Sequence, residues 1–475
     1  MINSKIKYFF TAFLLIFAFQ SCDQGFEDLN KNPNDPSTIP SELLTADIVR
    51  SAANNLYAPF LGGDMGANWI QHWTKVQYND EERYSPRETT IESFWTNIYE
   101  DVISDAKSME QLAIVEENPA QQAVGLILQA YGFSLLTDAY GDIPFVDAIK
   151  GGTENNFTPA FDSQDVVYDG IIALLDQAND LINSGAGSIG AGADLLYGGD
   201  ASKWQKFANS LQFRCLMRIS SKKDVGAKLT ELLSRPMFTS NNDEAKLAYL
   251  GALPNANPIF ETIDITAGAR GEWKVNSVMV DMLVSLNDPR LPLYVGLNDA
   301  GEYRGKPSGY RDVPNDDYNY ANVSPIGPFY AKATLPGYFL SFSELLFLHS
   351  EAAAKGLISG DAATFYNAAL ASNFEANGIA GDATAYAEAH PYNGEESIAL
   401  QNWIGLYGQG FEAWTEWRRN RVPALTPAFE GTIDEIPSRY KYPGIEQSLN
   451  KANYDAAVTA LGGENNLTAK IWWLQ

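Results

Sequence analysis

Apolar residues recur at helical spacing along most of the chain from Ser41 onward, which predicts a largely helical protein. In the segment 164–182, Val167, Ile171 and Leu174 fall on one helix face. Consecutive helices of about 15–20 residues joined by short loops predict stacked helical hairpins, as in tetratricopeptide arrays, although the repeat signature itself is absent. The other predicted helices are 42–57, 65–78, 91–113, 120–138, 200–221, 277–286, 341–355, 362–377, 395–407 and 411–419.

Two long stretches, 238–273 and 298–336, lack this periodicity. The second is rich in Gly, Pro, Asn and Asp, and it contains Tyr310, Tyr318 and Tyr320. Loops of this length are uncommon inside a compact fold and are often functional. Because neither stretch carries a charge run or a low-complexity segment, we expect residues 41–475 to form a single all-α domain with long irregular loops.

The predicted helix 411–419 combines aromatic and charged residues at close spacing. Trp414 lies on its apolar face with Trp417 beside it, and Glu412 and Glu416 are one turn apart. This composition favours a core helix with buried ion pairs, in which Glu416 pairs with an arginine three residues on and Glu412 pairs elsewhere in the fold. A catalytic pair of glutamates is the alternative.

The first 21 residues are typical of a secretion signal. Two lysines precede the apolar run 8–19, which is too short to span a bilayer, and a small residue then precedes Cys22. This ending resembles a lipobox, so we predict a lipoprotein signal peptide over 1–21 and acylation of Cys22. The polar segment 22–40, with its prolines, reads as a tether between the lipid and the fold.

The charge balance narrows the range of partners. The 475 residues include 33 Lys and Arg against 59 Asp and Glu, a net charge of −26. Such an acidic chain lacks the basic patches that nucleic-acid binding requires. With Cys22 acylated, Cys215 would be the only free thiol, so no intramolecular disulfide is expected.

Enzymatic and metal chemistry find little support in the sequence. The three histidines have no metal or triad spacing, and nucleophile-elbow, P-loop and dinucleotide-binding motifs are absent. A glycosidase needs only two carboxylates, and nothing singles out a pair. We expect no cofactor. Clustered oxygen ligands at 79–82 and 315–320 leave a weak signal for calcium, without EF-hand spacing.

Aromatic and amide residues suggest a binding site for sugars. A sugar ring has an apolar face and a hydroxyl edge, so aromatic platforms flanked by amides suit it. We expect Trp69 and Trp73 to share one face of the helix 65–78, behind a glycine-rich approach, and the tyrosine-rich loop to fold over it. Core positions for both tryptophans are the alternative. The predicted ligand-binding residues are Asn68, Trp69, Trp73, Gln77, Tyr78, Tyr310, Tyr318 and Tyr320.

Several motifs in order carry a family resemblance. The segment 411–425, FEAW-x-EWRR followed by P-x-L, resembles the most recognisable signature of the SusD/RagB family of nutrient-binding outer-membrane lipoproteins. The resemblance extends over nearly the whole chain through AYGDIPF at 139–145, NDPRLP at 287–292, S-x-SELLFL-x-SEAA at 341–353, IPSRY at 436–440 and YPGIE at 442–446.

The resemblance implies an α-superhelical fold and a lipid anchor on the outer face of the outer membrane. It also implies capture of glycans or oligosaccharides and their delivery to a TonB-dependent transporter of the SusC kind. A peptide- or protein-binding lid and, less favoured, a glycan-degrading enzyme are the alternatives. Ligand contacts vary between members of the family, so none is carried over to a residue of this chain.

Overall fold

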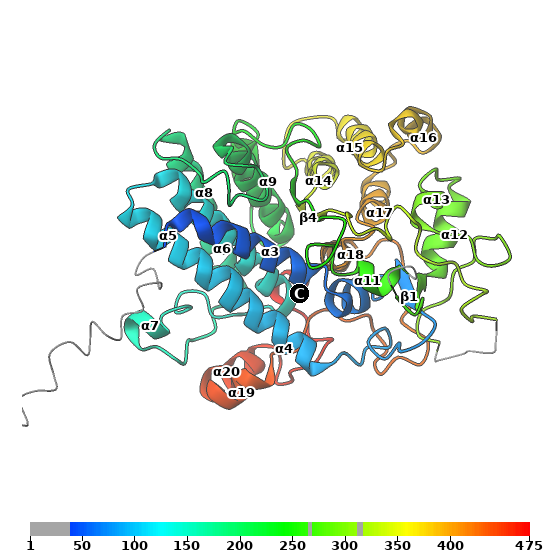
Figure 1. Cartoon of the computed structure of the whole chain (residues 1–475), viewed down its shortest axis with the longest axis horizontal. Helices are drawn as coiled ribbons and strands as arrows, with labels where there is room; N and C mark the ends of the chain where they lie inside the picture. Colours follow the sequence, from blue (N-terminus) through cyan, green and yellow to red (C-terminus); the bar gives the residue numbers. More distant parts are fainter. Residues whose placement is uncertain (1–38, 265–267, 311–316) are drawn as a thin grey trace, which may run out of the picture. The chain divides into compact units, whose positions relative to one another are not determined.

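The computed structural model describes residues 39–264, 268–310 and 317–475. The predicted signal peptide, the lipidated Cys22 and nearly all of the tether lie outside these residues, as do Asn315 and Asp316 of the calcium hypothesis. Residues 41–475 form one compact unit. Figure 1 colours its helices in sequence order, from blue to red.

In the first half of this unit the long helices pack on one another in the order in which they follow along the chain. Helix α5 packs on α6, α6 on α8 and α8 on α9, while in the second half α14 packs on α15 and α17 (Figure 1). The predicted helical hairpins are therefore confirmed. The helices of these two groups are α5 (Asp105–Val115), α6 (Pro119–Tyr140), α8 (Gln164–Asn183), α9 (Ala201–Ile219), α14 (Phe342–Ala354), α15 (Ala362–Ala376) and α17 (Glu395–Gly405).

Caps and turns fix the ends of several of these helices. Asn118 accepts a hydrogen bond from the Gln121 amide at the start of α6, and Asp200 caps α9 in the same manner. The remaining α-helices are α3 (Leu44–Leu56), α4 (Glu88–Asn97), α7 (Gly151–Glu154), α10 (Gly226–Leu232), α11 (Phe260–Ile263), α12 (Ser277–Ser285), α13 (Leu291–Tyr294), α16 (Ala383–Ala389), α18 (Gly410–Asn420), α19 (Gly444–Leu449) and α20 (Lys451–Ala460). None of the described helices is long and apolar enough to cross a membrane.

Short strands organise the two irregular stretches. Strand β1 (Trp73–Lys75) pairs antiparallel with β3 (Trp273–Val275), and β2 (Ala245–Leu247) pairs antiparallel with β4 (Gly337–Leu340). Both pairs have only two strands, so they clip loops together instead of forming a layer of their own. Sequence analysis did not predict these strands, because strands this short carry too little alternation to be recognised.

The predicted helix 65–78 is wrong. The chain instead forms a π-helical segment, Pro59–Ala67, followed by turns and then strand β1. Gln71, at φ 60°, interrupts the helical path, and the residues after it pair with β3. Tertiary pairing with a partner about 200 positions away in the chain thus overrides the local pattern, which is why spacing alone failed here.

The glycines of this segment serve packing. A Cβ on Gly66 would lie 2.6 Å from the backbone carbon of Gly410, and a Cβ on Gly410 would overlap the Gly62 carbonyl oxygen. The π-helical segment and the first turn of α18 therefore touch backbone to backbone, which only glycine permits. The glycine-rich approach to a ligand that we predicted is in fact a contact inside the fold.

Helix α18 lies in the core, as the sequence predicted. Trp414 is fully buried and stacks on Tyr440, with ring centroids 4.8 Å apart. Glu412 and Glu416 both pair with Arg218 of α9, and Glu416 also pairs with Arg419 at 2.8 Å. Burial alone would raise the pKa of Glu416, but the arginines lower it to about 2. These paired carboxylates are structural, so the alternative of a catalytic pair loses its support.

Candidate functional site

Three of the predicted ligand-binding residues lie inside the core. Trp69 and Trp73 are each only 1% exposed, and Asn68 is completely buried. The Trp69 ring contacts Trp414, and its indole nitrogen donates to the carbonyl oxygen of Glu81 at 2.8 Å. The prediction of a solvent-facing tryptophan platform is therefore wrong, because these side chains fill the space between the π-helical segment, β3 and α18.

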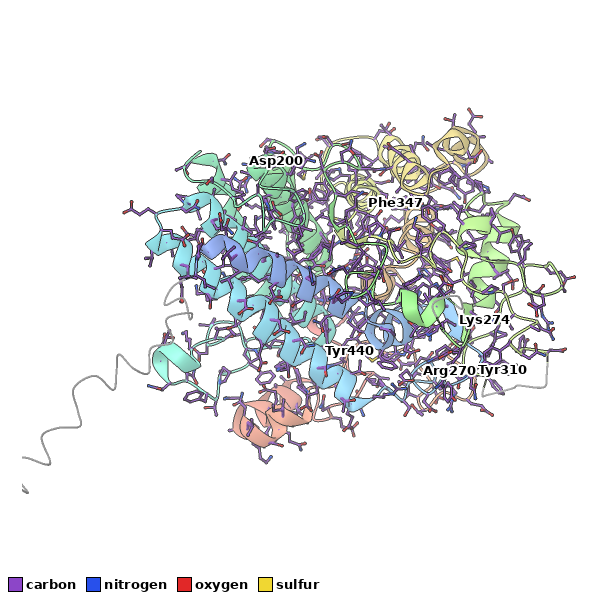
Figure 2. All side chains as sticks on the ribbon, viewed as in Figure 1. Asp200, Arg270, Lys274, Tyr310, Phe347 and Tyr440 are labelled. Carbon is purple, nitrogen blue, oxygen red and sulfur yellow. The ribbon has the colours of Figure 1, made fainter. Side chains whose placement is uncertain are left out.

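The other predicted residues come together at the open end of the β1–β3 pair. Because the strands are antiparallel, residues that follow β1 lie beside residues that precede β3. Tyr78, three residues after β1, is 45% exposed, and the guanidinium of Arg270, three residues before β3, lies 5.4 Å from its ring centroid. Figure 2 shows Arg270, Lys274 and Tyr310 in this same region, near β1.

A stack of aromatic rings forms the centre of the surface. Tyr310 lies on Phe429 with ring centroids 4.5 Å apart and planes 18° apart, and Phe429 is 53% exposed. The ring of Tyr318 is 5.4 Å from Tyr310, and the guanidinium of Arg304 lies 5.6 Å from Tyr318. We call Tyr78, Tyr310, Tyr318, Tyr320 and Phe429 the aromatic surface.

The tyrosine-rich loop is attached to the segment after β1, and not to a helix face carrying Trp69 and Trp73 as predicted. The hydroxyl of Tyr320 donates to the side-chain oxygen of Gln77 at 2.7 Å, and the ammonium of Lys274 donates to the Tyr320 carbonyl at 2.8 Å. Burial lowers the pKa of Lys274 to about 8, with Asp299 acting in the opposite direction. Asn79 donates its amide to the backbone oxygen of Tyr310. The loop is thus held at both described ends.

The buried carboxylate of Glu82 holds the loop that carries Tyr310 against strand β1. Glu82 is completely buried and accepts hydrogen bonds from the Thr74 hydroxyl at 2.7 Å and from the Gly309 amide at 3.1 Å. The Lys306 ammonium lies 4.0 Å from the same carboxylate. One buried group therefore links β1 to the residue before Tyr310, so the position of that ring is set by the core.

The backbone on both sides of the surface adopts unusual conformations. Tyr78 has φ 57°, which is uncommon for a bulky residue. Gly309 has φ 86°, and a Cβ there would overlap the backbone oxygen of Phe429. Only glycine fits at position 309. The positive φ of Tyr78 is a strained conformation of the kind that persists where the surroundings over-determine it and that clusters at ligand-binding sites.

The three carboxylates of residues 80–82, which precede the aromatic Tyr84, each have a separate partner. Asp80 pairs with Arg83, and Glu81 pairs with Arg87 at 2.8 Å, while Glu82 supports the loop. Among the described residues no group of three or more His, Cys, Asp or Glu side chains is placed to hold a metal ion. The segment 79–82 is therefore used in structural pairs, and the calcium hypothesis for 315–320 stays a prediction.

The histidines occupy structural positions. His72 lies 4.7 Å from the Trp403 ring, His349 lies 4.5 Å from Phe213, and the Nε2 atom of His390 is 2.8 Å from the Leu286 carbonyl oxygen. Burial lowers the pKa of His72 to about 3 and that of His349 to about 4, so both are neutral at physiological pH.

Sequence reasoning missed Phe429, Arg270 and Arg304. Phe429 follows the recognised motif 411–425 within a segment that has no periodicity, so nothing in the sequence pointed to its exposure. Arg270 lies beside Tyr78 only because β1 and β3 pair, and Arg304 lies beside Tyr318 only in the folded chain, so the sequence alone predicts neither contact. Pro427 and Gly431, each two residues from Phe429, indicate an irregular segment and no more.

Comparison with known proteins places this architecture in a family. The SusD-like family, described as "Starch-binding associating with outer membrane", matches residues 33–443. The chain belongs to the SusD-like family. The match includes every residue of the aromatic surface and of the β1–β3 pair, so the candidate site lies within the region that defines the family. A search among curated proteins finds no match.

Several solved structures share the fold over nearly the full chain. A chitin-binding protein is 26% identical, with a TM-score of 0.82, and the match covers 92% of this chain and 100% of that one. A SusD homolog from Bacteroides uniformis is 23% identical, with a TM-score of 0.79 and coverage of 92% and 98%. A chitin-binding SusD homolog from Flavobacterium johnsoniae is 21% identical, with a TM-score of 0.76 and coverage of 92% and 97%.

Proposed function

We propose that the protein binds glycan chains of the starch or chitin kind at its aromatic surface and serves nutrient capture at the outer membrane. The observation that carries this proposal is the stack of the exposed Phe429 on the half-buried Tyr310, with Tyr318 beside it. Aromatic faces pack on the C–H faces of sugar rings, and the amide of Gln77 and the arginines supply donors and acceptors for hydroxyl groups.

The firm support beneath the surface also favours a binding role. Glu82, Lys274 and Asn79 attach the loop to the core, so little conformational entropy is lost when a ligand binds. Family membership and the 26% identical chitin-binding protein favour a glycan over other ligands. Catalysis finds no comparable support, since the carboxylates of Asp80, Glu81 and Glu82 beside the surface are engaged in structural contacts.

The cellular setting belongs to the same proposal. Residues 1–21 would direct export, Cys22 would carry the lipid, 22–40 would form the tether and 41–475 would form the binding domain at the cell surface. A TonB-dependent transporter of the SusC kind would receive the glycan. The membrane association described for the family supports this arrangement. Loss of membrane fractionation in Cys22→Ala is the expected result, and a variant that remains membrane-bound without its transporter would contradict lipidation.

The binding proposal is tested with the purified protein and a panel of maltooligosaccharides, chitooligosaccharides and peptides. We expect an oligosaccharide to bind, and Tyr310→Ala and Phe429→Ala each to weaken it by about 1–3 kcal/mol, the magnitude of aromatic stacking on nucleobases. Isothermal titration calorimetry measures the affinity.

A matched control is Phe157→Ala, which removes a 73% exposed ring outside the aromatic surface and should bind as the wild type does. If both surface variants bind with unchanged affinity, the ligand site lies elsewhere. Binding of peptides but not of oligosaccharides would favour the peptide-binding alternative, and release of shorter sugars would reveal an enzyme.

A further inference from the structure

A small cavity lies apart from the aromatic surface. It has a volume of about 200 Å³ and is bounded by strand β4, the segment 329–336 and the ends of α15 and α17. None of its lining residues belongs to the aromatic surface. The Tyr407 ring separates the cavity from the core around β1, because it contacts Tyr330 at 4.9 Å on one side and Trp73 at 5.9 Å on the other.

Two lysines line this cavity, each above an aromatic ring that also lines it. The ammonium of Lys332 lies 3.8 Å from the ring centroid of Phe329, and that of Lys246 lies 5.6 Å from the ring of Tyr338. Such cation–π contacts hold an ammonium in place without neutralising its charge. The geometry therefore directs positive charge toward one small space in a chain whose net charge is −26.

The positive charges are only partly balanced. Lys246 pairs with the buried Glu244 at 2.8 Å. Within the described part of the chain, no carboxylate lies within 4.0 Å of the Lys332 ammonium, so the cavity lining has one cation in excess. Partial burial lowers the pKa of Lys332 below its ordinary value, which shows that its charge is held at an energetic cost. A carboxylate beside Lys332 would offset that cost.

Neutral polar groups complete the lining. The side-chain amide of Gln409 and the hydroxyl of Tyr338 belong to residues that line the cavity, and both residues are half-buried. An amide and a phenol can each donate and accept, which suits the hydroxyl groups of a sugar. The volume lies below the range of about 300–1,000 Å³ that is typical of drug-sized sites, so the occupant is small.

We propose that this cavity binds a compact organic carboxylate of the size of one acidic sugar ring, with the carboxylate at Lys332 and the ring against Phe329 and Tyr338. The site is independent of the glycan-binding proposal, because it shares no residue with the aromatic surface and requires a charge that a starch or chitin chain lacks. Its ligand could reach the protein free in solution or at the end of a longer glycan.

The test compares glucuronate with glucose, which differ by the carboxylate, on the purified protein. We expect saturation-transfer NMR and titration to show that glucuronate binds at least about tenfold more tightly than glucose, as one charged hydrogen bond implies. The same carboxylate presented at the end of an oligosaccharide distinguishes a free sugar acid from a chain terminus. Equal binding of the two sugars, or no binding of glucuronate at about 10 mM, roughly tenfold above a Kd of 1 mM, would overturn the proposal.

Variants locate the site. Lys332→Gln should weaken glucuronate binding at least about fivefold, and Lys332→Arg should retain part of it. Lys451→Gln is the matched control, because it removes one positive charge from the exposed side of α20 and should leave glucuronate binding unchanged. Arg270→Gln tests the aromatic surface as the competing site: if it lowers the affinity and Lys332→Gln does not, the carboxylate binds elsewhere and the proposal fails. The comparison of the two sugars on the wild-type chain decides the charge requirement even if a variant does not fold.

Discussion

Two groups of aromatic residues, close in sequence, have opposite fates in this protein. Trp69 and Trp73 lie in the core against α18 and β3, whereas Tyr78, a few residues further on, is 45% exposed and belongs to the aromatic surface. The change takes place at strand β1, whose three residues are all buried. A short strand thus separates aromatic rings that support the fold from rings that face the solvent.

The comparison shows how a binding surface can be rigid without being part of the core. The core tryptophan Trp69 donates to the backbone of Glu81, and Glu82 next to it holds the amide of Gly309 beside Tyr310. The positions of the surface rings are therefore set from the core through the segment 79–84, in which Asn79, Glu81, Glu82 and Tyr84 are buried. Their own burial contributes little, so changing them should alter binding and leave stability nearly intact.

The largest effect is expected for Trp73→Ala. Truncating a fully buried aromatic residue costs about 3–5 kcal/mol of unfolding free energy, because the cavity cannot collapse completely. Urea unfolding, followed by circular dichroism, measures the loss. Phe157→Ala, at a ring that is 73% exposed, is the control and should change stability by no more than about 0.5 kcal/mol. An unchanged stability for Trp73→Ala would show that this ring is not part of the core, and the two groups of aromatic residues would then not differ.

Gly410→Ala should have the next largest effect. A Cβ at this position would overlap the Gly62 carbonyl oxygen, so the π-helical segment and α18 must separate. We expect a loss of about 2–3 kcal/mol of stability, in the range of overpacked cores. The control is Gly152→Ala, where an added Cβ meets no atom within 4 Å. Equal melting temperatures for the two variants would show that the backbone contact is not tight.

The pH dependence of stability should come from the buried region. The pKa of His72 is lowered to about 3 by burial, whereas an unfolded histidine titrates near 6.5. Below pH 6.5 the unfolded chain therefore takes up a proton that the folded chain does not, so the contribution of His72 to stability falls as pH falls from 6.5 toward 3. Between pH 6.5 and pH 5 the loss amounts to about 2 kcal/mol.

His72→Phe removes this titration and retains a ring against Trp403 and Tyr407. Its stability should therefore fall less steeply than that of the wild type between pH 6.5 and pH 5, although His349, whose pKa is also lowered, keeps part of the slope in both proteins. Denaturant titrations at several pH values measure the two slopes. Identical slopes would show that His72 is not buried in its neutral form.

Sequence patterns predicted the helical regions well and the site only in part. Helices such as α6 and α9 carry long periodic faces and capping residues at Asn118 and Asp200, so local signals were sufficient. The segment around Trp69 and Trp73 has helical spacing but is organised by its pairing with β3, some 200 positions away. No local pattern encodes such a partner, and the error over these two tryptophans follows directly.

The tyrosine-rich loop was recognised because its composition and length are unusual. Tyr310, Tyr318 and Tyr320 do converge with Gln77 and Tyr78, through the hydrogen bond from Tyr320 to Gln77 and the contacts around Tyr310. Phe429 was missed because it comes from a fourth segment, joined to Ser308 by one backbone hydrogen bond of 2.9 Å. For a site assembled from distant loops, the sequence can predict which types of residue take part, but it cannot predict every residue that does.

The smallest and most specific effect concerns the stacked pair in the aromatic surface. Tyr310 and Phe429 lie 4.5 Å apart, so each ring holds the other in the orientation that a sugar ring would meet. In a double-mutant cycle of Tyr310→Ala and Phe429→Ala, we expect the two losses of affinity to be non-additive by about 0.5–1.5 kcal/mol, the strength of an aromatic pair. Titration of the single and double variants with the same oligosaccharide measures this coupling, and their melting temperatures should all stay close to that of the wild type. Strict additivity would mean that the rings contact the ligand independently. A marked loss of stability in either single variant would instead place the pair with the core tryptophans, and the division of the aromatic residues at β1 would no longer hold.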